Sequence, residues 1–315
     1  MSAVFLDRAS LDFGDVALSR LEAITELRCF DQTTPHQVVA RLQGVEIAIV
    51  NKVVLDAAVL DQLPALRLIC VAATGTNNVD LDGAARRGIA VSNCQGYGTA
   101  SVAQHTLALM LALATRLFSY QQAVARGEWQ RSAQFCLLDY PSMELSGKTL
   151  GIVGYGELGQ QVARLAAALG MRVLVAARPG SQPAGDRLAL DALLPQVDVL
   201  TLHCPLTEQT RGLIGRSALR RMKPGALLIN AARGGIVDEE ALREALCSGH
   251  LGGAGVDVLS QEPPHQGNPL LDDSIPNLIL TPQCAWGSRE ARQTIVNQMA
   301  ENIAAYGRGE ALRRV

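Results

Sequence analysis

The sequence predicts an α/β fold built on doubly wound parallel sheets, and three observations support this class. The chain has 315 residues, and that length favours two domains. Apolar residues make up 48% of the chain and aromatic residues only 4%, a composition that suits helices packed on parallel strands. Short apolar runs alternate with longer helical stretches, as expected for parallel strands joined by helical crossovers.

Composition also narrows the function. The formal net charge is −2, so a strongly basic face for nucleic acid is not expected. The seven cysteines form no Cys-x-x-Cys pair, which favours a reducing compartment over a disulfide framework or a metal cluster. The most apolar stretch, residues 106–118, is too short to span a bilayer, and no signal segment opens the chain. We therefore expect a soluble, cytoplasmic protein with no metal and no membrane partner.

The first third of the chain contains three runs that are typical of buried strands. Turn or helix signals follow each run, including a helix start at Asp56 and a helix over residues 81–87 that ends at Gly88. The predicted strands are residues 45–50, 66–71 and 89–91.

A long helix is predicted over residues 99–116, and it is apolar on nearly every side, which is typical of a helix buried between two bodies of structure. Residues 126–147 lose this period and predict a connecting arm. A second α/β series follows, and its strand count suits a doubly wound nucleotide-binding sheet before the chain becomes helical again from Ser288. Its six predicted strands are residues 149–153, 172–176, 197–202, 226–229, 253–257 and 278–280.

The sharpest local signal is a Gly-x-Gly-x-x-Gly pattern formed by Gly154, Gly156 and Gly159. It lies between a predicted strand and a helical run over residues 160–169, which distinguishes it from ordinary turn glycines. In this setting the first glycine makes the turn, the second lets the backbone approach a pyrophosphate, and the third allows close packing of helix and strand. The pattern predicts dinucleotide binding.

The residues that end the next strand select the cofactor. An NAD site usually places Asp or Glu about 20 residues after the glycines, where it accepts from the ribose 2′-hydroxyl. Here Ala177 and Arg178 occupy that segment, and Arg178 can pair with a 2′-phosphate, although it can also be a solvated loop cation. The missing acid and the arginine together favour NADP(H) over NAD(H).

Further motifs follow one another in order along the chain. They occupy residues 71–80, 102–111, 151–159, 202–207, 230–238, 255–264 and 281–286. Together they resemble the D-isomer-specific 2-hydroxyacid dehydrogenases, most closely the glycerate dehydrogenase and hydroxypyruvate–glyoxylate reductase branch. The resemblance covers nearly the whole chain.

This resemblance implies two Rossmann-like domains with the active-site cleft between them. A discontinuous, flavodoxin-like substrate domain would comprise residues 1–98 and 287–315, and an NAD(P)-binding domain residues 99–286. Family members are commonly homodimers, and the arm around residues 129–141 falls where their subunits meet. The cofactor residues that the resemblance implies, with Asp257 on the nicotinamide carboxamide, are Gly154, Gly156, Glu157, Leu158, Gly159, Ala177, Arg178, His203, Cys204, Pro205, Thr207, Ala231, Ala232, Arg233 and Asp257.

Reduction of a 2-keto acid requires a fixed carboxylate, a polarised carbonyl and a proton donor. Arg233 follows a predicted strand, and its planar guanidinium can hold carboxylate and carbonyl oxygens together. The resemblance adds the backbone amides of Thr74 and Gly75 as carboxylate ligands. Further candidates for a short polar substrate are Asn51, Lys52 and Trp286, although Lys52 suits a solvated loop equally well.

The chain departs from the family pattern at Gln283. The family has a general-acid histidine there, oriented by the glutamate that matches Glu262. Glutamine donates hydrogen bonds but does not titrate near neutral pH. Four histidines elsewhere in the chain offer no convincing substitute: His265 is expected at the surface, His105 in the core, His36 at a helix start and His203 on the cofactor side.

Several functions remain open at this point. A D-2-hydroxyacid dehydrogenase that acts on small 2-keto acids is favoured, and Gln283 leaves three forms of it open. The chain is a slow reductase with water as the proton donor, an enzyme with an altered substrate preference, or an engineered inactive variant. The alternative is a non-catalytic NAD(P)-sensing protein on the same scaffold.

Overall fold

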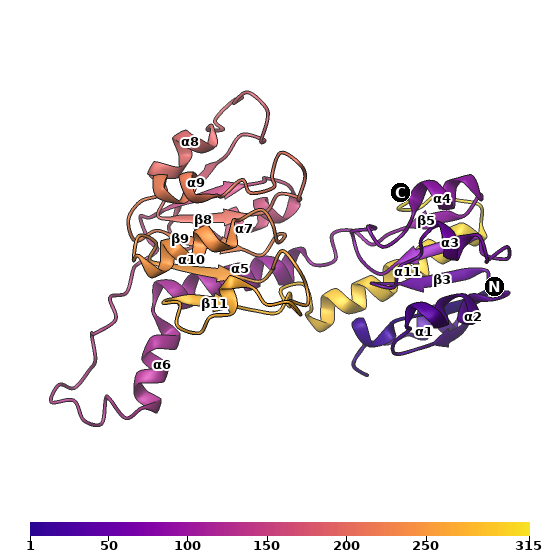
Figure 1. Cartoon of the computed structure of the whole chain (residues 1–315), viewed down its shortest axis with the longest axis horizontal. Coiled ribbons are helices and arrows are strands. Elements are labelled where there is room, and N and C mark those ends of the chain that lie inside the picture. The colour runs from indigo at the N-terminus through magenta and orange to yellow at the C-terminus, as the bar shows by residue number, and fades with distance from the viewer. The chain divides into compact units, whose positions relative to one another are not determined.

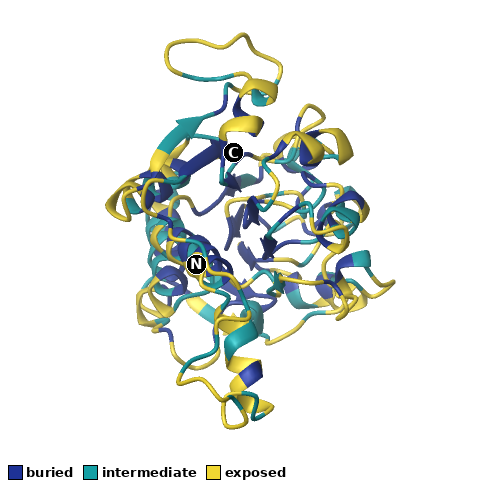
Figure 2. Ribbon diagram, turned by 90° about the vertical axis from the view of Figure 1, so that its left-hand side faces the viewer, coloured by how far each residue is buried: buried dark blue, intermediate teal, exposed yellow.

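The structure is a computed structural model that describes residues 1–315. The chain forms two compact units, one of residues 1–98 and 287–315 and one of residues 99–286 (Figure 1). Figure 2 shows most strands as buried and most loops as exposed.

The first unit is built on a five-stranded parallel sheet of order β2-β1-β3-β4-β5. The strands are β1 (Ser2–Phe5), β2 (Glu26–Cys29), β3 (Ile47–Val50), β4 (Leu68–Val71) and β5 (Ala90–Ser92). The α-helices are α1 (Ser19–Glu22), α2 (Val38–Leu42), α3 (Ala57–Leu60), α4 (Leu81–Arg86) and α11 (Arg289–Gly307), and two 3₁₀ turns are η1 (Arg8–Ser10) and η2 (Pro35–Gln37).

The three strands predicted in this region are confirmed as β3, β4 and β5, each within two residues of its expected bounds. Strands β3 and β4 are fully buried, which explains their clear apolar runs. Strands β1 and β2 were not predicted. The edge strand β2 is largely exposed, so it needs no apolar run.

The buried Arg292 joins the C-terminal helix α11 to the N-terminal part of the first unit. The Ser288 hydroxyl caps the helix by accepting from the Ala291 amide, as the predicted helix start requires. The Arg292 guanidinium donates to the Leu11 carbonyl and forms a two-pronged pair with Asp15, at 2.6 Å to each carboxylate oxygen. This pairing connects two segments of the first unit that are far apart in the sequence.

The second unit has a six-stranded parallel sheet of order β11-β10-β9-β8-β6-β7. The strands are β6 (Thr149–Val153), β7 (Arg172–Val175), β8 (Val199–Leu202), β9 (Leu227–Asn230), β10 (Gly253–Val256) and β11 (Leu278–Leu280). The helices are α5 (Thr99–Ala114), α6 (Leu117–Ala125), α7 (Glu157–Ala168), α8 (Leu190–Leu193), α9 (Arg216–Arg221) and α10 (Glu239–Cys247), and two 3₁₀ turns are η3 (Leu194–Gln196) and η4 (Pro269–Leu271). All six predicted strands are confirmed.

Helix α5 packs directly on the sheet because β10 contains glycines. A Cβ at Gly255 would lie 2.9 Å from the Leu109 Cβ, and one at Gly253 would lie 2.9 Å from a Leu113 methyl group. These short approaches bring the apolar helix onto β9 and β10. No single helix has the length and apolar composition needed to cross a membrane; α5 and α6 meet that test only when taken together, across a 60° bend.

The arm predicted over residues 126–147 contains no helix or strand. Helix α6, which was not predicted as a separate element, leads into it after Arg116 takes a left-handed φ of 55° and ends the run of α5. Phe118, Phe135 and Leu138 on this segment are 52%, 89% and 81% exposed. Figure 1 shows α6 and the arm projecting from the second unit.

The Arg292–Asp15 pair predicts how the first unit responds to acid. Hydrogen bonding to Arg292 lowers the pKa of Asp15 to about 2, below its value in an unfolded chain. The pair therefore stabilises the fold above about pH 4, and this stabilisation is lost as the pH falls towards 2. In urea unfolding followed by circular dichroism, Asp15→Asn should lower the midpoint at pH 7, and the difference from the parent should vanish near pH 2. Asp139→Asn, on the exposed arm, is the control, and a difference that persists unchanged at pH 2 would contradict this account.

Candidate functional site

The glycine-rich loop after β6 has the geometry of a dinucleotide cradle. Gly154 has a φ of +95°, and a Cβ there would lie 2.5 Å from the backbone of His203. A Cβ at Gly159 would overlap the carbonyl oxygen of Gly154. Gly156 is the N-cap of α7, and its Cβ position faces open space. The two crowded glycines fix the turn while the open one leaves the helix N-terminus accessible, so these residues fit a pyrophosphate.

The turn that follows β7 carries an exposed cation, Arg178. Ala177 donates its amide to Leu188, and Ser181 donates its amide and hydroxyl to the Arg178 carbonyl, which closes a turn. The exposed Arg178 side chain makes no hydrogen bond or ion pair within the protein. A guanidinium held near this strand end is free to meet an anion.

His203, after β8, is not a proton donor near neutral pH. Its Nε2 lies 3.0 Å from the Thr201 hydroxyl, while its Nδ1 is buried without a hydrogen-bond partner in the protein. Burial lowers the pKa of His203 to about 4, so the ring is neutral at pH 7. The His203 backbone lies beside the glycine loop, and the unpartnered side-chain nitrogen supports ligand binding at this edge of the sheet. The following turn is fixed by Thr210, whose hydroxyl donates to the Pro205 carbonyl and accepts from the Thr207 amide.

Asp257 follows β10 and organises the loop after β11. Its carboxylate is 2% exposed and accepts from the Thr281 hydroxyl at 2.5 Å and from the backbone amides of Cys284 and Ala285 at 3.0 Å. Its backbone carbonyl accepts from the Gln283 amide at 2.8 Å. By accepting these hydrogen bonds, Asp257 fixes the backbone conformation of residues 281–285.

His105, on α5, lies against the same carboxylate. Its Nε2 is 3.1 Å from the Thr281 hydroxyl and 3.5 Å from an Asp257 oxygen, so this histidine has polar partners and is only half-buried. His105, Asp257 and Cys284 each bring one ligand-type atom within 4.8 Å of the others. Burial and the nearby Asp257 charge raise the pKa of the Cys284 thiol, which opposes the thiolate form that a metal requires. We therefore assign this cluster to loop positioning.

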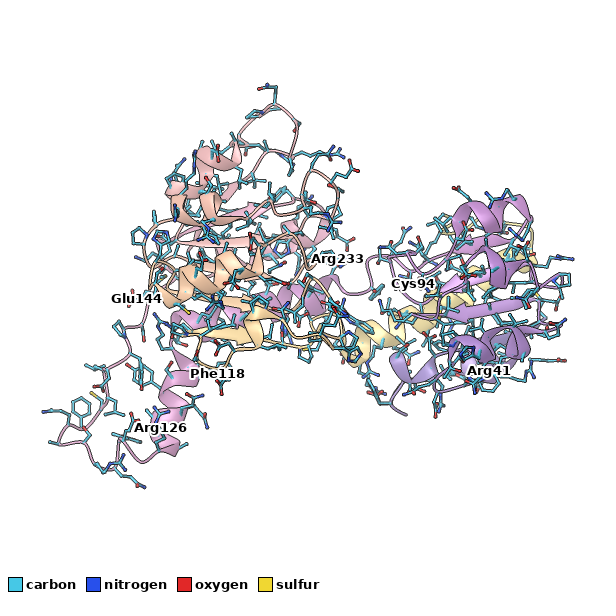
Figure 3. The ribbon with its side chains drawn as sticks, in the orientation of Figure 1. Arg41, Cys94, Phe118, Arg126, Glu144 and Arg233 are labelled. Carbon is cyan, nitrogen blue, oxygen red and sulfur yellow. The ribbon has the colours of Figure 1, made fainter.

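Gln283 is held in a strained backbone conformation, with a φ of +52°. Arg233 lies in the loop after β9, where it is exposed and donates to the Ala232 carbonyl at 2.7 Å (Figure 3). The buried Asn230 stabilises this loop by donating to the Arg233 carbonyl and accepting from the Ala232 amide. These contacts fix the backbone of the Arg233 loop while its side chain remains accessible.

Two residues brace the Glu262 loop against the Arg233 loop. A Cβ at Gly234 would overlap the carbonyl of Leu259, so only glycine allows this approach. Glu239, in the first turn of α10, accepts from the Ser260 amide at 2.6 Å and from the Ser260 hydroxyl and the Asn268 amide group at 2.7 Å. Glu262 itself is exposed and accepts from the Leu259 amide at 2.8 Å. The loops after β9, β10 and β11 thus meet at one edge of the sheet.

The substrate candidates of the first unit lie at the carboxyl ends of β3 and β4. Asp7 accepts from the backbone amides of Asn51, Lys52 and Val53, which fixes the turn after β3, and the Asn51 side chain donates to the Ser10 hydroxyl. Lys52 lines a cavity of about 490 Å³ whose other charged residues are Asp7 and Asp31. The Thr74 hydroxyl donates to the Cys94 carbonyl, while the backbone amides of Thr74 and Gly75 make no hydrogen bond within the protein.

Within the second unit, the loops that carry Arg233, Glu262 and Gln283 follow adjacent parallel strands at one edge of the sheet, and the Gln283 amide donates to the Asp257 carbonyl. Trp286 is half-buried at the end of that unit. Sequence reasoning missed Glu239 and Asp7 and placed His105 only in the core. The only sequence feature that points to Glu239 is the pair of acidic residues in the first turn of α10, and acidic residues are common at any helix start.

Fold and site together define a dinucleotide-binding α/β protein. Residues 107–285 match the family model described as D-isomer specific 2-hydroxyacid dehydrogenase, NAD binding domain. The chain belongs to this family, and it contains an NAD-binding domain. It is 47% identical over 308 residues to a glycerate dehydrogenase of Methylorubrum extorquens, covering 98% of this chain and 96% of that protein. It is also 37% identical over 322 residues to a hydroxypyruvate reductase of Blautia hydrogenotrophica, covering 100% and 99%. The TT0316 protein of Thermus thermophilus shares the fold with a TM-score of 0.88 and 36% identity over both full chains.

Substitution of Glu239 should reduce catalysis and leave cofactor binding unchanged. Glu239→Gln replaces one carboxylate oxygen by an NH2 group, which cannot accept a hydrogen bond. Some of the hydrogen bonds from Ser260 and Asn268 are then lost, and the loop that carries Glu262 is held less firmly. Loop misplacement on the ångström scale lowers kcat about 10- to 100-fold. The matched control is Glu240→Gln, which loses only a pair with Arg243 on the same helix. Steady-state kinetics and fluorescence titration with NADPH measure the two effects, and equal kcat values for the two variants would contradict the bracing role.

Proposed function

We propose that this chain reduces a small 2-keto acid, of the hydroxypyruvate or glyoxylate type, to the D-2-hydroxy acid with a reduced nicotinamide dinucleotide as hydride donor. The observation that supports this most directly is the accessible Arg233 guanidinium, on a fixed loop of the sheet edge that also presents Asp257 and Gln283. A planar cation of this kind binds a carboxylate through two hydrogen bonds. Two proteins to which the chain is similar are named for these substrates, one as a glycerate dehydrogenase and the other as a hydroxypyruvate reductase.

The roles of the two units follow from the same proposal. Residues 99–286 hold the cofactor, and Asp257 is assigned to the nicotinamide carboxamide. Residues 1–98 and 287–315 form the substrate domain, in which the unbonded amides of Thr74 and Gly75 are suited to a carboxylate. Asn51, Lys52 and Trp286 complete the proposed substrate contacts.

Turnover of 2-keto acids is proposed to be slow because position 283 lacks a titrating group. Gln283 polarises a carbonyl at best through its amide protons, and the neutral His203 does not replace the missing acid. Water then supplies the proton that the developing alkoxide needs. We further propose that the exposed apolar segment of α6 and the arm packs against a second copy in a homodimer, because Phe118, Phe135 and Leu138 are otherwise in solvent.

Restoring an imidazole tests the role of position 283. Gln283→His should raise kcat for hydroxypyruvate and glyoxylate by about 10²–10⁴-fold, the usual contribution of general acid catalysis. NADPH oxidation measured at 340 nm gives both rates, and a dissociation constant for NADPH should stay unchanged. Equal rates in the two proteins would contradict this role. Tight NADPH binding with no turnover of any 2-keto acid by either protein would favour the NAD(P)-sensing alternative.

The preference for NADP(H) is proposed from the strand end at Ala177 and Arg178. Ala177→Asp places a carboxylate where it repels a 2′-phosphate and accepts from a 2′-hydroxyl. We expect the dissociation constant for NADPH to rise at least about tenfold and that for NADH to fall, a change of roughly 1.4 kcal/mol. Ala184→Asp adds the same charge to an exposed position of the same loop and is the control. Tighter NADH than NADPH binding in the parent protein would overturn the preference.

A further inference from the structure

A cavity of about 420 Å³ lies in the first unit, between the C-terminal half of α11, helix α1 and the C-terminal tail. Its volume is within the range of roughly 300–1,000 Å³ that is typical of sites for small molecules. Arg20 and Ile24 form the wall on the side of α1, and Leu312 and Arg313 form the wall on the side of the tail. The tail is held in place because the Arg313 carbonyl accepts from the Asn93 amide at 3.1 Å.

The cavity is separate from the substrate candidates of the first unit. Ile24 lies two residues before β2 begins. At the end of α11, Gly307 precedes Arg308 of the cavity, and a Cβ at Gly307 would lie 3.2 Å from the Met1 methyl group, just before β1. This part of the cavity therefore lies at the amino ends of the parallel strands, whereas the substrate candidates follow the carboxyl ends of β3 and β4.

The charged side chains around the cavity leave one cation in excess. Arg313 donates to the Glu301 carboxylate at 2.7 Å. Arg308 forms a two-pronged pair with Glu310, at 2.9 and 2.6 Å. The exposed Arg20 lines the same cavity and makes no hydrogen bond or ion pair within the protein. With two of its three guanidinium groups paired, the cavity is complementary to a ligand with a single negative charge.

The floor of the cavity is apolar. Ala300 and Ala304 are four residues apart and therefore lie on the same face of α11, and Ile24 and Leu312 flank them. Alanine side chains leave room above the helix and offer no polar group to a ligand. A bare inorganic anion would leave this surface uncovered, whereas a short hydrocarbon chain would remove it from water. Each methylene group that is fully buried strengthens binding about fourfold.

We propose that this cavity binds a small aliphatic monocarboxylate, with its carboxylate on Arg20 and its hydrocarbon chain against Ala300 and Ala304. A guanidinium group binds a carboxylate through two parallel hydrogen bonds. The site goes beyond the proposed reductase function, because it requires neither the dinucleotide nor the guanidinium of Arg233. It adds a second place for an organic acid, in the unit that does not hold the cofactor.

Calorimetry on the full chain without cofactor tests the ligand class, with hexanoate as the probe. Hexanoate should bind at least about tenfold more tightly than acetate, because its four additional methylene groups cover the apolar floor. Hexylammonium has a chain of similar length and the opposite charge, and it should bind at least about tenfold more weakly than hexanoate. Equal affinities for acetate, hexanoate and inorganic phosphate would indicate an adventitious ion only and would overturn the inference.

Two substitutions separate the cation from the apolar floor. Arg20→Gln should weaken hexanoate binding at least about tenfold, the loss expected for one charge-assisted hydrogen bond. Arg86→Gln, at an exposed arginine of α4 in the same unit, should leave it unchanged. Ala304→Leu fills the floor without changing a charge, so it should abolish the difference between hexanoate and acetate. Thermal unfolding of each variant checks that the fold is retained.

A last variant locates the bound hexanoate. The proposed substrate site also contains a guanidinium that is suited to a carboxylate, that of Arg233. Arg233→Gln should therefore leave the dissociation constant for hexanoate unchanged. Loss of hexanoate binding in Arg233→Gln, or unchanged binding in Arg20→Gln, would overturn the inference and leave the proposed keto acid reductase standing.

Discussion

The buried carboxylate of Asp257 is the constraint on which the proposed catalytic edge depends. A carboxylate removed from water is costly unless hydrogen bonds replace the water, and Asp257 obtains them from one hydroxyl and two backbone amides of residues 281–285. Hydrogen bonds to a charged group each contribute about 1.5–3 kcal/mol. That is enough to hold Gln283 in its left-handed conformation, which costs roughly 1–3 kcal/mol for a residue other than glycine.

The same logic extends to the neighbouring strand ends. Because β9, β10 and β11 are adjacent and parallel, their three carboxyl-end loops lie at one edge of the sheet. Gly234 allows the first loop to touch the second, Glu239 holds the second to α10, and Asp257 holds the third. Each loop is therefore braced by another element, which is how loop residues reach the accuracy that catalysis needs.

Most of the fold could be predicted because its signals are local. Buried parallel strands are continuous apolar runs, and a glycine fingerprint between strand and helix is rarely formed by ordinary turn glycines. The edge strand β2 escaped because an exposed edge needs no apolar pattern. Glu239 and Asp7 escaped because their function comes from backbone amides that are more than twenty residues away in the sequence. His105 appeared as a core residue because the pattern of α5 shows burial and not the carboxylate that faces it.

The central claim is that the loops after β9, β10 and β11 form a complete catalytic edge, although Gln283 in the third loop is not an ionisable proton donor. The pH dependence of kcat for 2-keto acid reduction at saturating NADPH tests it most directly. A general-acid imidazole makes kcat fall as the pH rises through about 6.5, whereas Gln283 cannot titrate in this range and the pKa of His203 is about 4. The account predicts a flat profile from about pH 5.5 to 8 in the parent protein and a falling one in Gln283→His. A parent profile that falls near pH 6.5 would contradict it.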